Sequence, residues 1–457
     1  MHCLKLEKLG IPTVPIVTEA FAELVKARAL KDGMPFMRFC FTPHPITGKS
    51  ALVHREYVEG TDPVTGKPLM KEIVELLIRP LSREEKKEGE VDRSVPRLIG
   101  PHSEDALQRI FLENHWTDFQ PVVLPTEERV AGMLKGTSHR PDEIIGEMRP
   151  AATHEAWQYT VEKVAANAVM AGAKPEYLPV ILALASTGLT SLFSSTTSFA
   201  RMVIVNGPIR SQIRMNSGIG ALGPFNHANA TIGRAWTLMS INLGGGAVPG
   251  ETYMGSVGNN LNYNNICFAE NEEKSPWQPF HIQKGFNPGE SVVSIFSGWS
   301  YVSQLGLNQD CWRSHVIRVV SAFNPPGTPL GEEWLQPGTP GLQGGLILLL
   351  DPLVAKDFNE REGSSTKEEV SKWIYENTLV PVEQYWGLDL AQHFHKPLAD
   401  RGIEPYASWA KLPKGTMIRH WATPDCINII VVGGGTNPGW YAGDFGYLAS
   451  ASIDAWR

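Results

Sequence analysis

The hydrophobic positions of this chain fall into two patterns that alternate along its length. Short apolar runs of strand length occur at 202–205, 292–296, 345–350 and 427–432. Between them, apolar residues recur at the spacing of one helix face at 160–173, 176–184, 226–243, 352–359 and 367–376. Strands that alternate with helices are typical of an α/β architecture, which we therefore predict.

The first 80 residues predict a small α/β unit of their own. A helix ends at Gly10, and a strand at 13–17, a helix at 19–30, a strand at 36–41 and a helix at 70–78 follow. Glycine is common just past a helix end, and parallel strands joined by helices make a Rossmann-like unit. No strand precedes the first helix. We therefore expect the unit 1–80 to be incomplete, either because the chain is truncated or because a partner chain completes the sheet.

Beyond this unit the pattern predicts a linker and one large domain. Residues 81–103 are charged and contain prolines, which favours a linker. Residues 104–457 carry the remaining strands and helices and predict a large α/β domain, in which two similar halves are one possible arrangement.

Composition and charge exclude several classes of protein. The net charge of −7 argues against nucleic acid as the main partner. The apolar runs are too short to cross a bilayer, so we expect no membrane association. The N-terminus has no basic segment followed by an apolar core, and the five cysteines are widely spaced. Both features favour a cytoplasmic protein with reduced thiols.

A glycine-rich loop predicts a binding site for a small anionic substrate. Residues 216–224 contain three glycines and lead into a helix that starts near Asn226. Glycines allow close backbone approach, and a helix N-terminus offers free N–H groups to a carboxylate or phosphate. A tight packed loop is an equally good interpretation. The residues that we assign to substrate binding here are Asn216, Ser217, Gly218, Asn229, Thr231 and Arg234.

An acidic run predicts a second candidate site, for acid–base chemistry. Cys267 is followed by Glu270 and Glu272, and His281 lies close behind. In an extended segment, alternation puts Glu270 and Glu272 on one face. The apolar residues around the run indicate partial burial, which raises carboxylate pKa values. A solvated charged loop is the competing interpretation, since most charge runs are solvated.

Other motifs are weaker. His44 stands between prolines at the end of a predicted strand, where ligands of open α/β sheets bind. His393 and His395 have the spacing of one strand face, but no cysteine or carboxylate cluster is near in sequence, so we predict no metal site. Gly433–Gly439 follows a strand without the helix that a dinucleotide site requires. We predict no cofactor bound by this chain.

Several segments resemble a known family. Residues 6–12, 18–21 and 43–45 resemble the C-terminal part of selenoprotein B subunits of glycine, sarcosine and betaine reductases, and more closely the related UGSC family. Further segments resemble the long second domain that accompanies the UGSC domain in this family: 116–118, 125–130, 162–172, 174–177, 216–218, 223–224, 228–234 and 268–273. In these relatives a cysteine or selenocysteine motif precedes the segment that matches 4–6, and a further cysteine stands at the position of Ala173. We therefore expect this chain to lack the N-terminal thiol; Cys3 is offset from the motif, and Ala173 replaces the further cysteine.

The resemblance implies a subunit of a heteromeric, thiol-dependent enzyme. It implies reductive or nucleophilic cleavage of a C–N or C–S bond in a small anionic substrate. A small partner subunit would supply a C-x-x-C-like cysteine or selenocysteine thiol beside Thr18, Glu19 and His44. One alternative is a non-redox lyase or hydrolase that uses Glu270, Glu272 and His281. Another is a structural subunit without catalysis.

Overall fold

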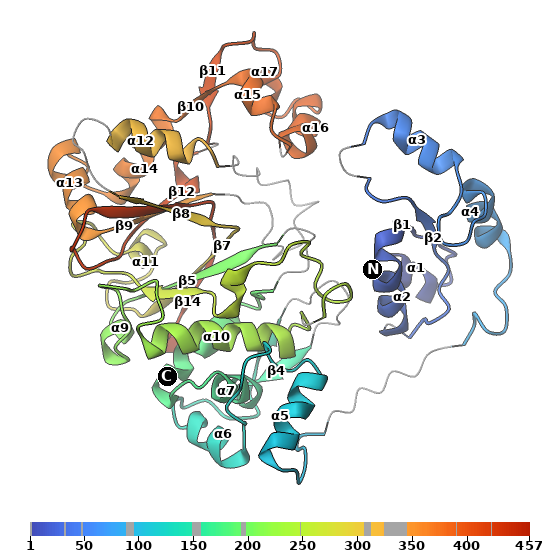
Figure 1. The fold of residues 1–457 in the computed structure, drawn as a ribbon, viewed down its shortest axis with the longest axis horizontal. Helices are drawn as coiled ribbons and strands as arrows, with labels where there is room; N and C mark the ends of the chain where they lie inside the picture. The colour runs from blue at the N-terminus through green and yellow to red at the C-terminus, as the bar shows by residue number, and fades with distance from the viewer. Residues whose placement is uncertain are drawn as a thin grey trace.

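The computed structural model describes most of the chain and shows two bodies of unequal size (Figure 1). It describes all residues except 1, 32, 47–48, 88–95, 149–156, 193–197, 247, 306–311, 324–344, 390 and 422. Helices and strands alternate along the chain, so the α/β prediction is confirmed. Within the described residues no helix is long and apolar enough to span a membrane.

The small body comprises a two-stranded parallel sheet with helices. Its elements are α1 (His2–Lys8), β1 (Ile16–Thr18), η1 (Glu19–Phe21), α2 (Ala22–Lys31), β2 (Cys40–Thr42), α3 (Ala51–Glu59) and α4 (Leu69–Ile78). Gly10 follows α1 with a φ of +79°, as the sequence predicts for a helix end. Thr18 pairs with Thr42, so both strands end at the same edge.

Two details of this body differ from the prediction. The predicted strand at 36–41 begins only at Cys40, because backbone hydrogen bonds from Met34 to Ala29 and from Met37 to Met34 form turns over the preceding residues. Helix α3 was not predicted. Ser50 caps its N-terminus by accepting a hydrogen bond from the Val53 N–H.

The large body contains two four-stranded mixed sheets. The first has the order β14-β7-β5-β6 and the second β12-β9-β13-β8. In each sheet one pair is parallel, β5 with β6 and β9 with β12, and the other pairs are antiparallel. The bounds are β5 (Ala200–Asn206), β6 (Ile266–Ala269), β7 (Val292–Gly298), β8 (Tyr301–Leu305), β9 (Leu346–Leu350), β12 (Ile427–Val431), β13 (Gly439–Gly443) and β14 (Gly446–Ser452).

The two sheets have the same topology, and each receives its outer antiparallel strand from the other half of the chain. β7 continues into β8, which belongs to the second sheet, and β13 continues into β14, which belongs to the first. The two crossings touch: Asp444 Oδ1 accepts hydrogen bonds of 3.0 Å from the N–H groups of Trp299 and Ser300. The large body therefore has two similar halves, which is one of the arrangements considered from the sequence. Each half repeats the same sheet topology, and the halves exchange their outer strands.

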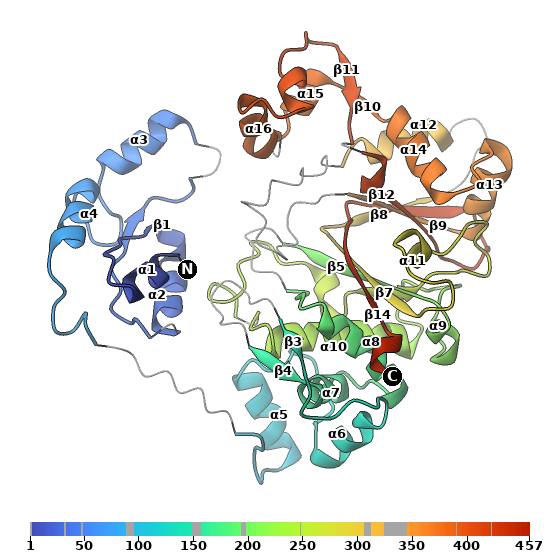
Figure 2. The same cartoon turned by 180° about the vertical axis from the view of Figure 1, so that it is seen from behind.

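The sheets stack face to face between two helical layers. On β5, Met202 and Ile204 pack in the core between the sheets, whereas Val203 and Val205 pack in the core under the helices. Figure 2 shows α7, α8 and α10 on one side of the first sheet. The helices on that side are α5 (Glu104–Glu113), α6 (Glu127–Leu134), α7 (Val161–Met170), α8 (Leu178–Ser186) and α10 (His227–Asn242). Over the second sheet lie α12 (Trp312–Val320), α13 (Pro352–Glu362) and α14 (Lys367–Asn377).

The remaining elements are short. A separate apolar cluster holds together β10 (Leu379–Pro381), α15 (Val382–Trp386), η4 (Ala391–His395), α16 (Lys396–Asp400), α17 (Tyr406–Trp409) and β11 (Met417–Arg419). The others are β3 (Ile144–Glu147), β4 (Gln158–Thr160), η2 (Pro175–Tyr177), α9 (Ile209–Gln212), η3 (Asn260–Tyr263), α11 (Phe280–Gln283), η5 (Pro424–Cys426) and η6 (Asp454–Trp456).

Candidate functional site

The acidic run lies at the carboxyl end of β6, beside the end of the parallel strand β5. Glu270 has no exposed surface. One of its carboxylate oxygens accepts hydrogen bonds from Asn206 Nδ2 at 2.7 Å and from the Phe280 N–H at 2.8 Å. The other is paired with Lys367 Nζ, and the Lys367 side chain is 1% exposed. Glu270 is therefore a buried carboxylate whose oxygens are both engaged.

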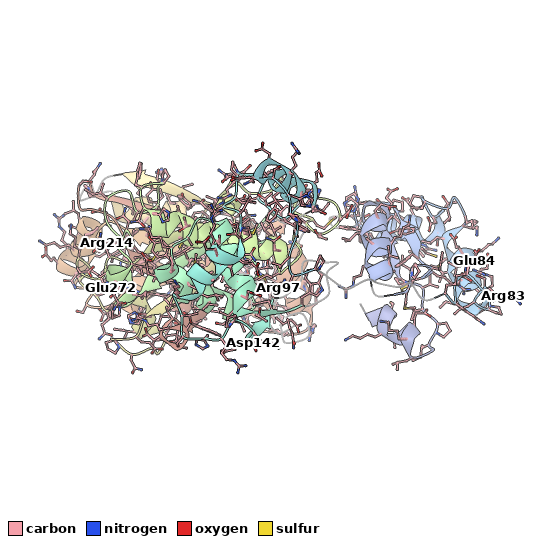
Figure 3. All side chains as sticks on the ribbon, turned by 90° about the horizontal axis from the view of Figure 1, so that it is seen from below. Arg83, Glu84, Arg97, Asp142, Arg214 and Glu272 are labelled. Carbon is pink, nitrogen blue, oxygen red and sulfur yellow. The ribbon has the colours of Figure 1, made fainter. Side chains whose placement is uncertain are left out.

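Glu272 and Glu273 converge on one arginine. Glu272 accepts hydrogen bonds from Asn206 Nδ2 at 2.9 Å, the Gly207 N–H at 2.8 Å and Arg210 Nη2 at 3.0 Å. Glu273 accepts from both terminal nitrogens of Arg210, and these hydrogen bonds hold the pKa of Glu273 below its usual range. Figure 3 labels Glu272 on the large body. We call these residues the Glu270 cluster: Asn206, Arg210, Glu270, Glu272, Glu273 and Lys367.

The Glu270 cluster joins the two halves of the large body. Lys367 belongs to α14 of the second half, and Asn271 next to Glu270 donates its N–H to Val431 O and its amide to Gly433 O. The extended alternation predicted for this run is wrong, because the chain turns after Glu270 and Ser275 N–H donates to Asn271 O. Glu270 and Glu272 still lie together, since both accept from Asn206.

The two other residues predicted with the run lie in different surroundings. The surroundings of Cys267 argue against the catalytic role predicted for it. Its side chain belongs to the core under α10, and burial raises the pKa of the thiol to about 12, which disfavours the reactive thiolate. His281 lies in α11 directly after Phe280 and has no exposed surface. Neither of its ring nitrogens has a hydrogen-bond partner among the described residues.

The glycine-rich loop at 216–224 is held by amide side chains. Asn216 Oδ1 accepts from the Gly218 N–H at 2.9 Å, and Asn216 Nδ2 donates to Ile219 O. Asn229 accepts from the Asn216 N–H and donates to the Asn216 and Ala221 carbonyls. Asn226 caps α10 by accepting from the Asn229 N–H. These contacts support the interpretation as a packed loop.

Two further residues assigned to substrate binding are also engaged within the fold. Thr231 donates its hydroxyl hydrogen to His227 O, one turn back along α10. Arg234 makes two hydrogen bonds, of 2.8 and 2.9 Å, to the buried carboxylate of Asp118 and a third to Pro121 O. Ser217 accepts a hydrogen bond from the Gly433 N–H, which brings the two glycine-rich loops together.

In the small body the structure brings together the three residues that the sequence grouped. Thr18 is the last residue of β1, and Thr18 Oγ1 lies 3.1 Å from His44 Nδ1. The His44 N–H donates to Glu19 Oε1 at 3.4 Å, and the Phe21 ring packs edge-on to the imidazole. Thr18 is buried, whereas Glu19 and His44 are exposed. This group therefore lies at the carboxyl ends of both parallel strands with its imidazole accessible.

This part of the chain is similar to a known family. The UGSC family matches residues 2–71, which we call the UGSC segment. The match runs from α1 to the start of α4, and it includes Thr18, Glu19 and His44. No curated protein and no solved structure matches the chain. The resemblance to selenoprotein B subunits stays a prediction.

The small body also contains a group of residues that the sequence did not suggest. These residues are Cys40 in β2, Asp62 between α3 and α4, and Glu72 in α4. All three are buried, and their ligand atoms lie within 4.8 Å of one another. Glu72 lies just beyond the matched range. The three residues are separated by up to 32 positions, so no local spacing indicates them. The signal that could have indicated them is the packing of the predicted helix 70–78 on the second predicted strand.

The histidine pair at the other end of the chain gives no support to a metal site. His395 is buried between the rings of Tyr385 and Tyr406, and its Nδ1 is hydrogen-bonded to the Tyr385 hydroxyl. Burial lowers the pKa of His395 to about 4. The side chain of His393 lies outside the described residues.

Proposed function

We propose that the UGSC segment forms the acid–base part of a thiol-dependent cleavage site, with His44 as the proton donor and acceptor. The observation that carries this proposal is the contact between Thr18 Oγ1 and His44 Nδ1 at the carboxyl ends of β1 and β2. A hydroxyl bonded to one ring nitrogen fixes the orientation and tautomer of an imidazole and leaves the other nitrogen to the substrate.

The alternative site in the large body has less support. Every carboxylate of the Glu270 cluster has a cationic or amide partner, so none is poised to exchange a proton with a substrate. A general acid or base needs a proton position within reach of the substrate. We therefore assign the Glu270 cluster to stability and the exposed imidazole of His44 to chemistry.

The thiol in this proposal belongs to a partner subunit with a C-x-x-C-like motif. Its thiolate attacks the substrate carbon that bears the leaving group, and a C–S bond forms as the C–N or C–S bond breaks. The protonated imidazole of His44 gives its proton to the leaving group. In a reductive cleavage a second thiol of the partner then attacks the new thioether sulfur, the two thiols become a disulfide, and the substrate carbon takes up a proton.

Two of the described cysteines are poorly suited to supply the thiol themselves, which fits a thiol on a partner subunit. Cys40 and Cys267 are buried, and burial raises the pKa of the Cys40 thiol to about 11. Thiolates of low pKa are the nucleophiles in such reactions. We accordingly propose a hetero-oligomeric oxidoreductase in the reducing cytoplasm, acting on a small carboxylate, with no cofactor held by this chain.

The test is a comparison of variants in the complex. The tagged full chain is purified from its native host with whatever small subunit accompanies it, and mass analysis identifies a C-x-x-C-like sequence. Amine or thiol release from a panel of 2-amino and 2-thio carboxylates is then measured with dithiothreitol as reductant. We expect His44→Asn to lower the rate about 100-fold or more and the exposed linker variant His102→Asn to leave it unchanged.

Two results would overturn the proposal. The first is full turnover by the purified chain without any thiol, and the second is unchanged turnover in His44→Asn. Loss of turnover in Glu270→Gln with an intact fold would instead support the lyase or hydrolase alternative. A complex that is active after this chain is removed would indicate a structural subunit.

A further inference from the structure

Cys40, Asp62 and Glu72 bring three potential metal ligands together from three elements of the small body. Cys40 opens β2, Asp62 lies between α3 and α4, and Glu72 lies in the first turn of α4. Asp62 and Cys40 have no exposed surface, and Glu72 is 4% exposed. The thiol sulfur and one oxygen of each carboxylate lie within 4.8 Å of one another.

The hydrogen bonds of the two carboxylates leave oxygen lone pairs available. Asp62 Oδ1 accepts from the Val64 and Thr65 N–H groups, while Asp62 Oδ2 accepts, from the residues that the structure describes, one hydrogen bond, from the Phe41 N–H at 2.6 Å. Glu72 Oε2 accepts from Thr65 Oγ1 at 2.6 Å. A carboxylate oxygen has two lone pairs, so Asp62 Oδ2 and Glu72 Oε1 can each still bind a cation.

The charge of this group is only partly balanced. Lys67 is a cation close to Glu72: its Nζ lies 3.7 Å from Glu72 Oε1, and its side chain is 56% exposed. Burying a carboxylate is costly unless it is paired or binds a metal. Asp62 is compensated by backbone N–H groups, but Glu72 shares its buried surroundings with a second negative charge and a solvent-screened ammonium.

A second observation points to a ligand at this place. Thr42 is 4% exposed, and Thr42 Oγ1 has no hydrogen-bond partner among the residues that the structure describes. Thr42 stands two residues after Cys40 in β2, so the two side chains project from the same face of the strand. Buried hydroxyl groups are nearly always paired, and an unpaired one on the strand face of Cys40 indicates a missing partner.

The small body also has little core of its own. Its buried apolar side chains among the described residues 2–87 are Ala22, Ala29, Cys40, Phe41 and Leu69. Units of about 80 residues or fewer with thin cores are commonly stabilised by disulfides, metals or partners. A cation held by these ligands would tie β2, the α3–α4 loop and α4 together.

We propose that a zinc-class divalent cation binds between Cys40 Sγ, Asp62 Oδ2 and Glu72 Oε1, with a water on the fourth side to which the Thr42 hydroxyl can bond. A thiolate with carboxylates favours zinc over calcium or magnesium, which prefer oxygen ligands alone. Ligands of one tetrahedral zinc ion lie about 3.6 Å apart, so small side-chain rotations would close the present arrangement. The site does not depend on the proposed chemistry of His44.

The test measures metal binding by the full chain, without any activity assay. Purified chain is stripped with a chelator and titrated with Co²⁺, whose thiolate-to-metal charge-transfer band reports a bound cysteine. We expect about one ion per chain, displaced by Zn²⁺. Cys40→Ser should abolish the charge-transfer band, and Glu72→Gln should weaken binding about tenfold or more. Cys3→Ser, in the same body, is the control and should bind like the parent chain.

Two outcomes would overturn this site. One is a parent chain that binds neither Co²⁺ nor Zn²⁺ at micromolar concentration. The other is an undiminished charge-transfer band and affinity in Glu72→Gln and Cys40→Ser, which would locate the metal elsewhere. If Cys40→Ser does not fold by circular dichroism, the parent spectrum and Glu72→Gln decide the question, because Gln keeps the shape of the side chain.

Discussion

At the scale of single residues, Glu270 and His44 are both candidate proton-transfer groups, and their surroundings favour different roles for them. Glu270 is buried and bonded to Asn206, Phe280 N–H and Lys367, whereas His44 is exposed and has one nitrogen beside Thr18. A carboxylate with engaged oxygens contributes to stability, and an oriented, accessible imidazole can transfer protons. We therefore expect substitutions of the two residues to affect different measurements.

Glu270→Gln should destabilise the chain by about 3–5 kcal/mol, because Lys367 is left as an unpaired buried charge. The free energy of unfolding is measured by urea denaturation. The double variant with Lys367→Met should recover part of the loss. Glu273, whose side chain is 62% exposed, gives the matched control Glu273→Gln, with a loss of about 1 kcal/mol or less. A loss in Glu270→Gln no larger than in Glu273→Gln would contradict the structural role.

Buried histidines should make stability depend on pH below neutrality. Burial lowers the pKa of His395 and of His420 to about 4, below the unfolded value near 6.5. The unfolded chain then binds more protons, so their contribution is fully present above about pH 6.5 and is lost as the pH falls through 4. We expect protonation of each histidine to lower the free energy of unfolding by on the order of 3 kcal/mol over that pH range.

His420→Gln tests this dependence. Gln can still donate a hydrogen bond to Phe323 O, which His420 contacts at 2.8 Å, but it does not titrate. The slope of unfolding free energy against pH between about 6.5 and 4 should become shallower. His102→Gln, at an exposed position, should leave the slope as it is. Equal slopes in the parent and His420→Gln would refute the assignment.

Which side chains come together in a site could be predicted from the sequence only where the local pattern of strands places them. Thr18 and His44 follow predicted strands, and ends of parallel strands meet, so their contact could be expected from the sequence. Glu270 acquires its role from Lys367 and Asn206, which lie 97 and 64 positions away. No local pattern distinguishes such a carboxylate from a catalytic one.

At the scale of elements, the close packing of α10 on the loop before β6 depends on one glycine. A Cβ at Gly233 would lie 1.9 Å from Asn264 O and 3.1 Å from Cys267 Cβ. Elsewhere in helices, replacing glycine by alanine is favourable by about 1 kcal/mol. At this position the backbone carbonyl cannot move aside cheaply.

Gly233→Ala should therefore destabilise the chain by about 1–3 kcal/mol. Gly132 in α6 is the control, since a Cβ there meets nothing within 4 Å. Gly132→Ala should stabilise the chain by up to about 1 kcal/mol. Thermal unfolding of both variants measures the difference, and stabilisation by Gly233→Ala would show that the contact between α10 and the loop is loose.

Long apolar elements were the predictable part of the fold. β5, β7, β9 and β12, with α7, α8, α10, α13 and α14, all lie where the hydrophobic pattern placed them. Two of the missed strands have weaker patterns: β14 reads Gly-Tyr-Leu-Ala-Ser-Ala-Ser, and β13 contains two glycines. Such strands are specified by their neighbours in the sheet more than by intrinsic preference.

At the scale of the whole molecule, strand exchange makes the two halves of the large body dependent on each other. β8 completes the sheet of the second half and β14 that of the first, and the crossings meet at Gly298 and Asp444. Neither sheet keeps all four strands if the other half unfolds. We therefore expect the two sheets to unfold as one cooperative unit.

Gly298→Ala tests this coupling, because a Cβ there would lie 2.4 Å from Asp444 O. Hydrogen exchange measured by mass spectrometry should show similar losses of protection in β5 and in β9, one in each sheet. Gly289→Ala, where a Cβ meets nothing within 4 Å, should change neither. Loss of protection confined to one sheet would contradict the cooperative description.

The central claim, that His44 transfers protons at the site in the UGSC segment, is tested most directly by chemical rescue. In the purified complex His44→Ala should lose thiol-dependent cleavage, and added imidazole should restore part of the rate in a concentration-dependent way, because His44 is exposed. Thr18→Val should lower the rate with the fold intact. Full activity of His44→Ala without imidazole would contradict the account. Loss of activity in His44→Ala that imidazole does not restore at any concentration would contradict it as well.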